Sequence, residues 1–127
     1  MRVKFNGNEG SQMDIKRHGG NGRRSQCVEY GGLLYTSGIT STDLEGDITA
    51  QCQDVFRVID QMLARRGIDK NRILTATITL ADMKDYGDFN AAWDAWVIDA
   101  YEPARSVTEG ALAIPEFKVK VAVVAAL

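Results

Sequence analysis

The sequence predicts an α+β fold in which one sheet carries two helices on one of its faces. Two segments, residues 48–66 and 86–99, repeat apolar side chains at helical spacing. A third segment, residues 72–81, alternates apolar residues with threonine, which is typical of a half-buried strand. Further strand-like segments precede the first helix and follow the second, so the predicted order is β-β-β-α-β-α-β-β.

The first three strands are predicted from alternation and one turn signal. Residues 13–17 alternate weakly, which indicates an edge strand. Residues 23–30 and 33–37 flank the pair Gly31-Gly32, and two glycines between strand-like runs favour a two-residue turn. We therefore expect these two runs to form a β-hairpin.

The first helix is expected to run from Ile48 to Arg66, after a connection at residues 38–46 that is rich in Thr, Ser, Asp and Gly. Asp47 is a suitable N-cap, and Gly67 suits the position just beyond the last turn. The apolar residues that follow the helical spacing are Ile48, Cys52, Val55, Phe56, Ile59, Met62 and Leu63.

The middle strand and the second helix each have two distinct faces. Four apolar residues of the strand point one way: Leu74, Ala76, Ile78 and Leu80. Three threonines point the other way: Thr75, Thr77 and Thr79. One stripe of the second helix is expected to belong to the core: Phe89, Trp93, Trp96 and Val97.

Two strands are predicted at the end of the chain, at residues 105–112 and 117–126, and we treat them as neighbours in the sheet. The helices are expected to cover Leu74, Ile78, Phe117, Val119, Val121 and Val123. The opposite face then presents Thr75, Thr77, Thr79, Lys118, Lys120, Ala122 and Val124. A half-polar sheet face of this kind often packs against a copy of itself, which predicts a homo-oligomer.

Length and composition indicate one domain with an ordinary core. The chain has 127 residues, 45% hydrophobic and 25% charged, with a net charge of −2. We expect a flexible lead-in at residues 1–12 and one folded domain at residues 13–127. The charge gives no global attraction to nucleic acid, and no apolar run of about 18 residues suggests a membrane span. The start of the chain does not resemble a signal peptide, so we expect a cytoplasmic protein.

The cysteines and the histidine do not indicate a metal site. Cys27 and Cys52 are distant in sequence and fit no metal-binding or disulfide spacing, and His18 is the one histidine. We expect Cys52 to be a small core residue of the first helix. Neither a disulfide nor a bound metal is expected.

Four stretches carry a resemblance to a known family. They are Leu34-Tyr35-Thr36-Ser37-Gly38, Thr75-Ala76-Thr77-Ile78-Thr79-Leu80-Ala81-Asp82-Met83, Asp88-Phe89-Asn90-Ala91-Ala92-Trp93 and Pro103-Ala104-Arg105-Ser106. In this order they resemble the motifs of the Rid/YjgF family, the reactive-intermediate imine and enamine deaminases. The match extends over about residues 13–127.

The resemblance implies a chorismate-mutase-like α+β fold and a homotrimer with its sites in clefts between subunits. It also implies a cofactor-independent hydrolase that converts small 2-imino or 2-enamino acids to 2-oxo acids and ammonia. By the resemblance, Arg105 in the Pro-Ala-Arg motif holds the substrate carboxylate, and Ser37 and Asn90 lie at the site. The residues alone leave an alternative for each position. Arg105 forms a salt bridge between subunits, Ser37 is an ordinary serine at the end of a strand, and Asn90 is a helix cap.

Three positions depart from the family pattern. Arg24 stands where active members usually have a tyrosine, Val107 where they often have a cysteine, and Lys120 where they usually have a glutamate that orients water. Ser37 and backbone groups near Val107 are still expected to bind the nitrogen side of the substrate. A substrate with two carboxylates would suit Arg24, Arg105 and Lys120 together.

Glu109 and Lys120 each have two interpretations. Arg105, Val107 and Glu109 share one face of their strand by the two-residue period. Glu109 is then either a base for water or the salt-bridge partner of Lys118 or Lys120. Lys120 beside Arg105 is either a base or nucleophile with a lowered pKa, or a second cation for dianionic ligands. The sequence thus supports a deaminase or, alternatively, a non-catalytic trimer that binds small carboxylates in a regulatory or chaperone-like role.

Overall fold

The computed structural model describes residues 14–127, so the predicted lead-in at residues 1–12 lies outside the described part. The strands are β1 (Lys16–His18), β2 (Cys27–Tyr30), β3 (Leu33–Thr36), β4 (Ile39–Thr40), β5 (Ile73–Leu80), β6 (Ala104–Glu109) and β7 (Val119–Ala126). The helices are α2 (Ile48–Ala64) and α3 (Tyr86–Trp96), with short 3-10 turns η1 (Lys70–Arg72) and η2 (Met83–Asp85). The predicted α+β class is confirmed.

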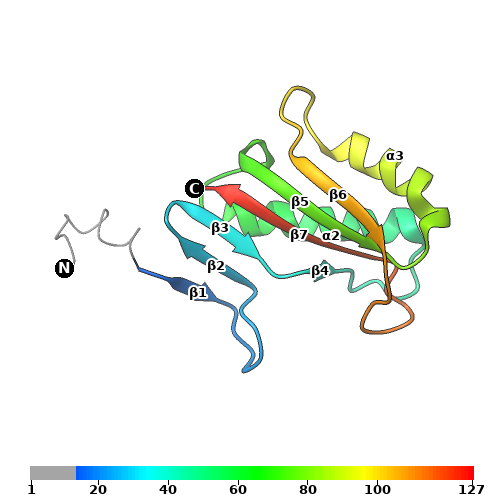
Figure 1. The fold of residues 1–127 in the computed structure, drawn as a ribbon, viewed down its shortest axis with the longest axis horizontal. Coiled ribbons are helices and arrows are strands. Elements are labelled where there is room, and N and C mark those ends of the chain that lie inside the picture. The colour runs from blue at the N-terminus through cyan, green and yellow to red at the C-terminus, as the bar shows by residue number, and fades with distance from the viewer. Residues whose placement is uncertain (1–13) are drawn as a thin grey trace.

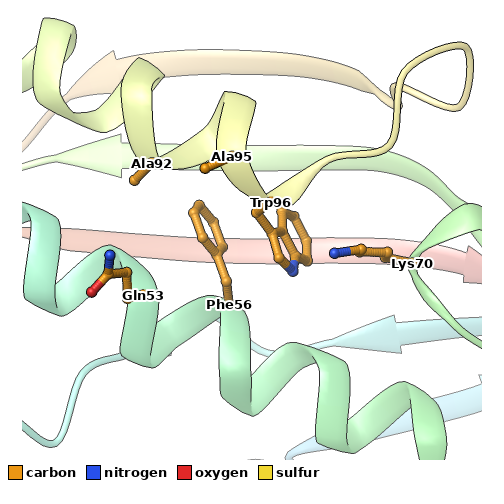
Figure 2. Close-up of a pocket in the computed structure, with 6 residues that line it drawn as sticks. All are labelled: Gln53, Phe56, Lys70, Ala92, Ala95 and Trp96. Carbon is orange, nitrogen blue, oxygen red and sulfur yellow. The ribbon is translucent and has the colours of Figure 1, made fainter.

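The described residues form one mixed sheet of seven strands in the order β1-β2-β3-β7-β5-β6, and β4 also pairs with β7 (Figure 1). Only the β5–β6 pair is parallel among these strands. Helices α2 and α3 both pack on one face, and Figure 2 shows them together in front of the strands.

The predicted pairing of the last two strands is wrong, because β5 lies between them. Ala76 of β5 pairs with Arg105 of β6 on one side and with Val123 of β7 on the other. The chain leaves β5, crosses through α3 and returns in the same direction, so β6 pairs parallel to β5 at the edge of the sheet. The final strand then enters antiparallel on the inner side of β5.

Helix α2 begins where its cap was predicted. The Asp47 carboxylate accepts a hydrogen bond from the backbone N–H of Ala50 at 2.9 Å. The helix ends at Ala64, two residues before the predicted end, and Gly67 follows in the left-handed region with φ of 71°. Such a backbone conformation favours glycine, which explains the stop signal.

Gln51 fastens the start of α2 to the entrance of β7. Its side chain is fully buried, and its amide nitrogen donates to the carbonyl oxygens of Gly46 and Glu116. Its amide oxygen accepts from the backbone N–H of Lys118 at 2.9 Å. One buried amide therefore satisfies three backbone groups of two loops.

The hairpin prediction is confirmed, with a later start. Gly31 and Gly32 make the turn with φ of 62° and 81°. Strand β2 begins at Cys27 instead of residue 23, because the Asn21 side chain accepts from the N–H groups of Arg23 and Arg24 and folds that segment into a turn.

Two further expectations are corrected in the strands. Leu74 is 47% exposed and does not face the helices, because the β5–β7 register shifts between Ile73 and Thr75 and moves Ile73 to the buried side. The two-residue strand β4 lies inside the segment predicted to be a connection. Helix α3 also ends at Trp96, before the predicted end at residue 99.

Four aromatic side chains fill the space between α2, α3 and the sheet: Phe56, Phe89, Trp93 and Trp96. The rings of Phe56 and Trp96 are stacked, with centroids 4.4 Å apart and planes 4° apart (Figure 2). The predicted core position of Trp93 and Trp96 is confirmed, because they are 4% and 8% exposed. Lys70 points at the indole of Trp96, and a hollow of about 270 Å³ lies beside Phe56, Trp96 and Lys70 (Figure 2).

No helix within residues 14–127 covers the other side of the sheet, which we call the open face. Its side chains alternate with buried ones along β5 and β7: Thr75, Thr77, Thr79, Lys120, Ala122 and Val124. No helix within residues 14–127 is long and apolar enough to cross a membrane.

Both cysteines are buried and unpaired. Cys52 is fully buried on α2 as predicted, and burial raises the pKa of its thiol to about 12. Across the described residues, no group of three His, Cys, Asp or Glu side chains converges as a metal site.

Candidate functional site

Arg105, at the start of β6, is held in place by three side chains of α3. Its Nη2 donates to the Asn90 Oδ1 at 2.8 Å. Its guanidinium carbon lies 5.2 Å from the centre of the Trp93 ring and 5.6 Å from the Phe89 ring. Both distances are typical of cation–π contacts. The structure thus brings together Arg105 and Asn90, two residues predicted for the site.

The local sequence explains this arrangement. Phe89 and Trp93 are four residues apart, so they lie on one side of α3, and Asn90 follows directly after Phe89. The crossover through α3 then places β6 beside this side of the helix, with Arg105 opposite Ala76. Arg105 remains exposed on the helix-covered side of the sheet edge.

The guanidinium has capacity left for a ligand. Among residues 14–127, Asn90 is its one hydrogen-bond acceptor, and no carboxylate forms an ion pair with it. An open hollow of about 350 Å³ lies along the β5–β6 pair, lined by Thr75, Ala76, Thr77, Ala104, Arg105 and Ser106, but its hydroxyl side chains belong to the open face and not to the side of the Arg105 guanidinium. A planar cation with free N–H groups can bind a small carboxylate.

Glu109 lies at the other end of β6 and already has a partner. Its Oε1 accepts from the backbone N–H of Met83 at 2.8 Å, which fastens the end of β6 to the turn before α3. Among the described residues of one chain, Glu109 forms no salt bridge with Lys118 or Lys120, because β5 separates the two strands. Val107, between Arg105 and Glu109, is half-buried against the core.

Lys120 lies on the open face, away from Arg105. It sits between the buried residues Val119 and Val121 of β7, so its side chain points to the side opposite the helices. Arg105 lies two strands away, about 10 Å, and three residues further along, also about 10 Å. Within the described part of one chain, Lys120 and Arg105 therefore do not lie side by side.

Ser37 and Lys120 both lie next to Gly38, the first in the sequence and the second in space. A Cβ atom on Gly38 would lie 2.6 Å from the Cδ of Lys120, so the lysine stem runs closely over the glycine backbone. Ser37 precedes this glycine, and its N–H donates to the carbonyl oxygen of Gln26 at 2.8 Å. These residues form a second group at the start of β4.

Arg24 belongs to neither group. It is exposed in the loop between β1 and β2, where its Nη1 donates to the carbonyl oxygen of Gly19 at 3.0 Å. Strands β1 and β6 are at opposite edges of the sheet, so Arg24 and Arg105 of one chain are far apart (Figure 1).

The sequence reasoning missed the rings beneath Arg105. Phe89 and Trp93 were assigned to the core, which they are, but each also presents its ring to the guanidinium. Their four-residue spacing around Asn90 was the available signal, since it places two rings and a polar group on adjoining parts of one helix.

Residues 14–127 define a small α+β protein whose mixed sheet has helices on one face and, at its edge, an arginine that forms no ion pair with any of these residues. The family model described as Endoribonuclease L-PSP matches residues 16–127. The chain is 42% identical over 105 residues to a RutC family protein of Haemophilus ducreyi, which covers 83% of this chain and 90% of that protein.

Solved structures agree with this match. A member of the YjgF protein family from Neisseria meningitidis has a TM-score of 0.85 and 40% identity, covering 91% of this chain and 96% of that one. A putative translation initiation inhibitor from Salmonella typhimurium has a TM-score of 0.84 and 36% identity, covering 91% and 99%. The chain therefore belongs to the YjgF/RutC family, which confirms the resemblance to Rid/YjgF proteins.

Proposed function

We propose that this protein is a cofactor-independent hydrolytic deaminase of small imine or enamine carboxylates. The observation that carries the proposal is Arg105, an exposed guanidinium fixed by Asn90 and two rings and lacking an anionic partner in the described chain. A charged group held in this way without a counter-ion is suited to bind an anionic ligand.

In the proposed reaction, Arg105 binds the carboxylate of a 2-imino acid and fixes its position for attack. Water forms a bond to C2, the C2–N bond breaks, and ammonia leaves, so that a 2-oxo acid remains. Backbone groups near Val107 are proposed to bind the nitrogen side. The reaction consumes only water and needs no redox or metal partner.

The proposal includes a homotrimer, because one chain separates the candidate residues. Arg105 lies on the helix-covered side of one edge, whereas Ser37 and Lys120 lie around β4 and the open face. Packing the open face against other copies would bring Ser37, Lys120 or Arg24 of one subunit toward Arg105 of the next. Light scattering should then give three times the chain mass of 14.0 kDa.

The deciding experiment is imine hydrolysis. An amino-acid oxidase generates 2-imino acids in situ, and semicarbazide competes for them as a trap. The wild-type protein should reduce semicarbazone formation, and Arg105→Ala should abolish this effect. Arg65→Ala, at the exposed end of α2, is the matched control that should retain it. No acceleration over a panel of imino acids would contradict the proposal.

A second candidate function is a non-catalytic trimer that binds small carboxylates in a regulatory or chaperone-like role. Two observations favour it: Lys120 replaces the water-orienting glutamate, and Glu109 is occupied by the Met83 N–H. Binding of 2-oxobutanoate that depends on Arg105, without any effect on imine loss, would support this function over the first.

The description of the family model names an endoribonuclease, and RNA cleavage is not part of the proposal. The net charge of −2 provides no overall attraction to a polyanion. The cytoplasmic location remains a prediction.

A further inference from the structure

We propose that Trp93 is a positioning residue whose indole ring, together with Phe89, sets the plane of the Arg105 guanidinium for carboxylate binding. The inference rests on the proposed role of Arg105 as the carboxylate clamp. In this role Trp93, a tryptophan buried in the core, contributes to the affinity of the protein for its ligand.

Two kinds of contact restrain the guanidinium in different directions. The hydrogen bond from Nη2 to Asn90 Oδ1, at 2.8 Å, restrains rotation within the plane of the group. The rings of Trp93 and Phe89, 5.2 Å and 5.6 Å from the guanidinium carbon, restrain its tilt. With both contacts present, the free N–H groups keep one orientation before a ligand arrives.

The rings form a rigid support because other aromatic residues pack behind them. Trp93 is 4% exposed and Phe89 is fully buried. The Trp93 ring lies 6.0 Å from Phe56 of α2 and 5.6 Å from Trp96, measured between ring centres. The support therefore extends through the helix layer, and an arginine on it loses less freedom when it binds an anion than an arginine in solvent would.

Electron density in the indole ring is the property that this proposal requires. A cation above a ring is attracted to its negative face, and electron-withdrawing substituents weaken that face without changing its shape. A purely structural tryptophan would depend on shape and volume alone. The two roles are therefore separable without disturbing the fold.

The test replaces tryptophan with fluorinated tryptophans during expression. The chain has two tryptophans, so the Trp96→Phe background labels only Trp93, and the Trp93→Phe background labels only Trp96. Isothermal titration with 2-oxobutanoate measures the Kd of each protein, and thermal unfolding monitors the fold. Fluorination of Trp93 should raise Kd stepwise, by about tenfold across the series. Fluorination of Trp96 should leave Kd unchanged.

Ordinary variants give a second measurement. Trp93→Leu should raise Kd and KM with little change in kcat, and Trp93→Phe should restore most of the affinity because it keeps a ring face. Met62→Ala, in the core of α2 and outside the aromatic group, should lower the Tm without changing Kd.

The outcomes separate this inference from the proposed function. If 2-oxobutanoate binding weakens with Trp93 fluorination but imine loss is not accelerated by any protein, the positioning role stands and the deaminase does not. If Kd is unchanged across the Trp93 series, or changes equally in the Trp96 series, the positioning role is overturned whether or not imines are hydrolysed. Absence of 2-oxobutanoate binding in the wild type would overturn both the clamp and its support.

Discussion

The two groups of candidate residues differ in how completely one chain supports them. At the edge of β6, Arg105 has a hydrogen-bond partner and two rings, all from α3. On the open face, Lys120 has the backbone of Gly38 beneath its stem, and its ammonium forms no ion pair within residues 14–127. The difference indicates that folding of one chain fixes the orientation of Arg105, whereas it leaves the Lys120 ammonium without an ion-pair partner among the described residues.

The largest expected effect concerns the stability of the helix-covered side. Gln51→Ala removes a buried amide and leaves the Gly46 and Glu116 carbonyls and the Lys118 N–H without their partner. We expect the free energy of unfolding to fall by about 3 kcal/mol, measured by urea denaturation. Gln53→Ala, on the exposed side of the same helix, is the control and should change it by less than about 0.5 kcal/mol. Equal losses of unfolding free energy in both variants would show that the hydrogen bonds of Gln51 make no specific contribution to stability.

The next effect is pH-dependent and concerns the segment after β4. The Asp54 carboxylate accepts from Arg57 and from Ser41 and Thr42, which follow β4, and so ties this segment to α2. The Arg57 hydrogen bond, followed by that from the Thr42 N–H, lowers the pKa of Asp54 from 3.8 to about 2.

Because the folded pKa is depressed, the stabilisation is fully present above about pH 4 and is lost as the pH falls through 2. It amounts to about 2 kcal/mol. Asp54→Asn should be less stable at neutral pH and should approach the wild type near pH 2, as followed by urea unfolding across that range. A constant difference between the two proteins at every pH would contradict this assignment.

Local signals predicted most of the fold, and non-local pairing accounts for the errors. The Asp47 cap, the Gly31-Gly32 turn and the helical stripes are short-range features, and all three are observed. The position of β6 depends on a crossover through α3, which leaves no pattern in the strand itself. The exposure of Leu74 depends on a register shift against β7.

The candidate site shows the same difference between local signals, which could be predicted, and non-local pairing, which could not. Arg105 and Asn90 could be chosen from short motifs, and the structure places them in contact. The separation of Arg105 from Lys120 could not be predicted, because it depends on which strand lies between them. The Glu109–Met83 contact likewise joins segments 26 residues apart.

A smaller effect is expected where Lys120 crosses Gly38. Gly38→Ala would place a methyl group 2.6 Å from Cδ and 2.9 Å from Cγ of the lysine, so the stem must move. We expect a loss of about 1 kcal/mol in the free energy of unfolding, because a flexible side chain can move aside. Gly87→Ala, in α3 with no atom near the added methyl group, should instead stabilise by about 0.5 kcal/mol. A Gly38→Ala protein as stable as the wild type would show that the stem is not constrained there.

The smallest expected effect on stability distinguishes the two groups most directly. Lys120 is exposed within one chain, so Lys120→Glu should change the free energy of unfolding of the subunit by less than about 0.5 kcal/mol. Its effect on hydrolysis then reports on the open face alone. A sharp rise in imine hydrolysis would mean that a carboxylate at this position activates water and that the natural lysine makes the site weak or specialised. A collapse of activity on a dianionic substrate, with monoanionic imino acids unaffected, would mean that Lys120 binds the second carboxylate. No change in either assay would remove Lys120 from the site and leave its binding role to Arg105 and the remaining candidate residues.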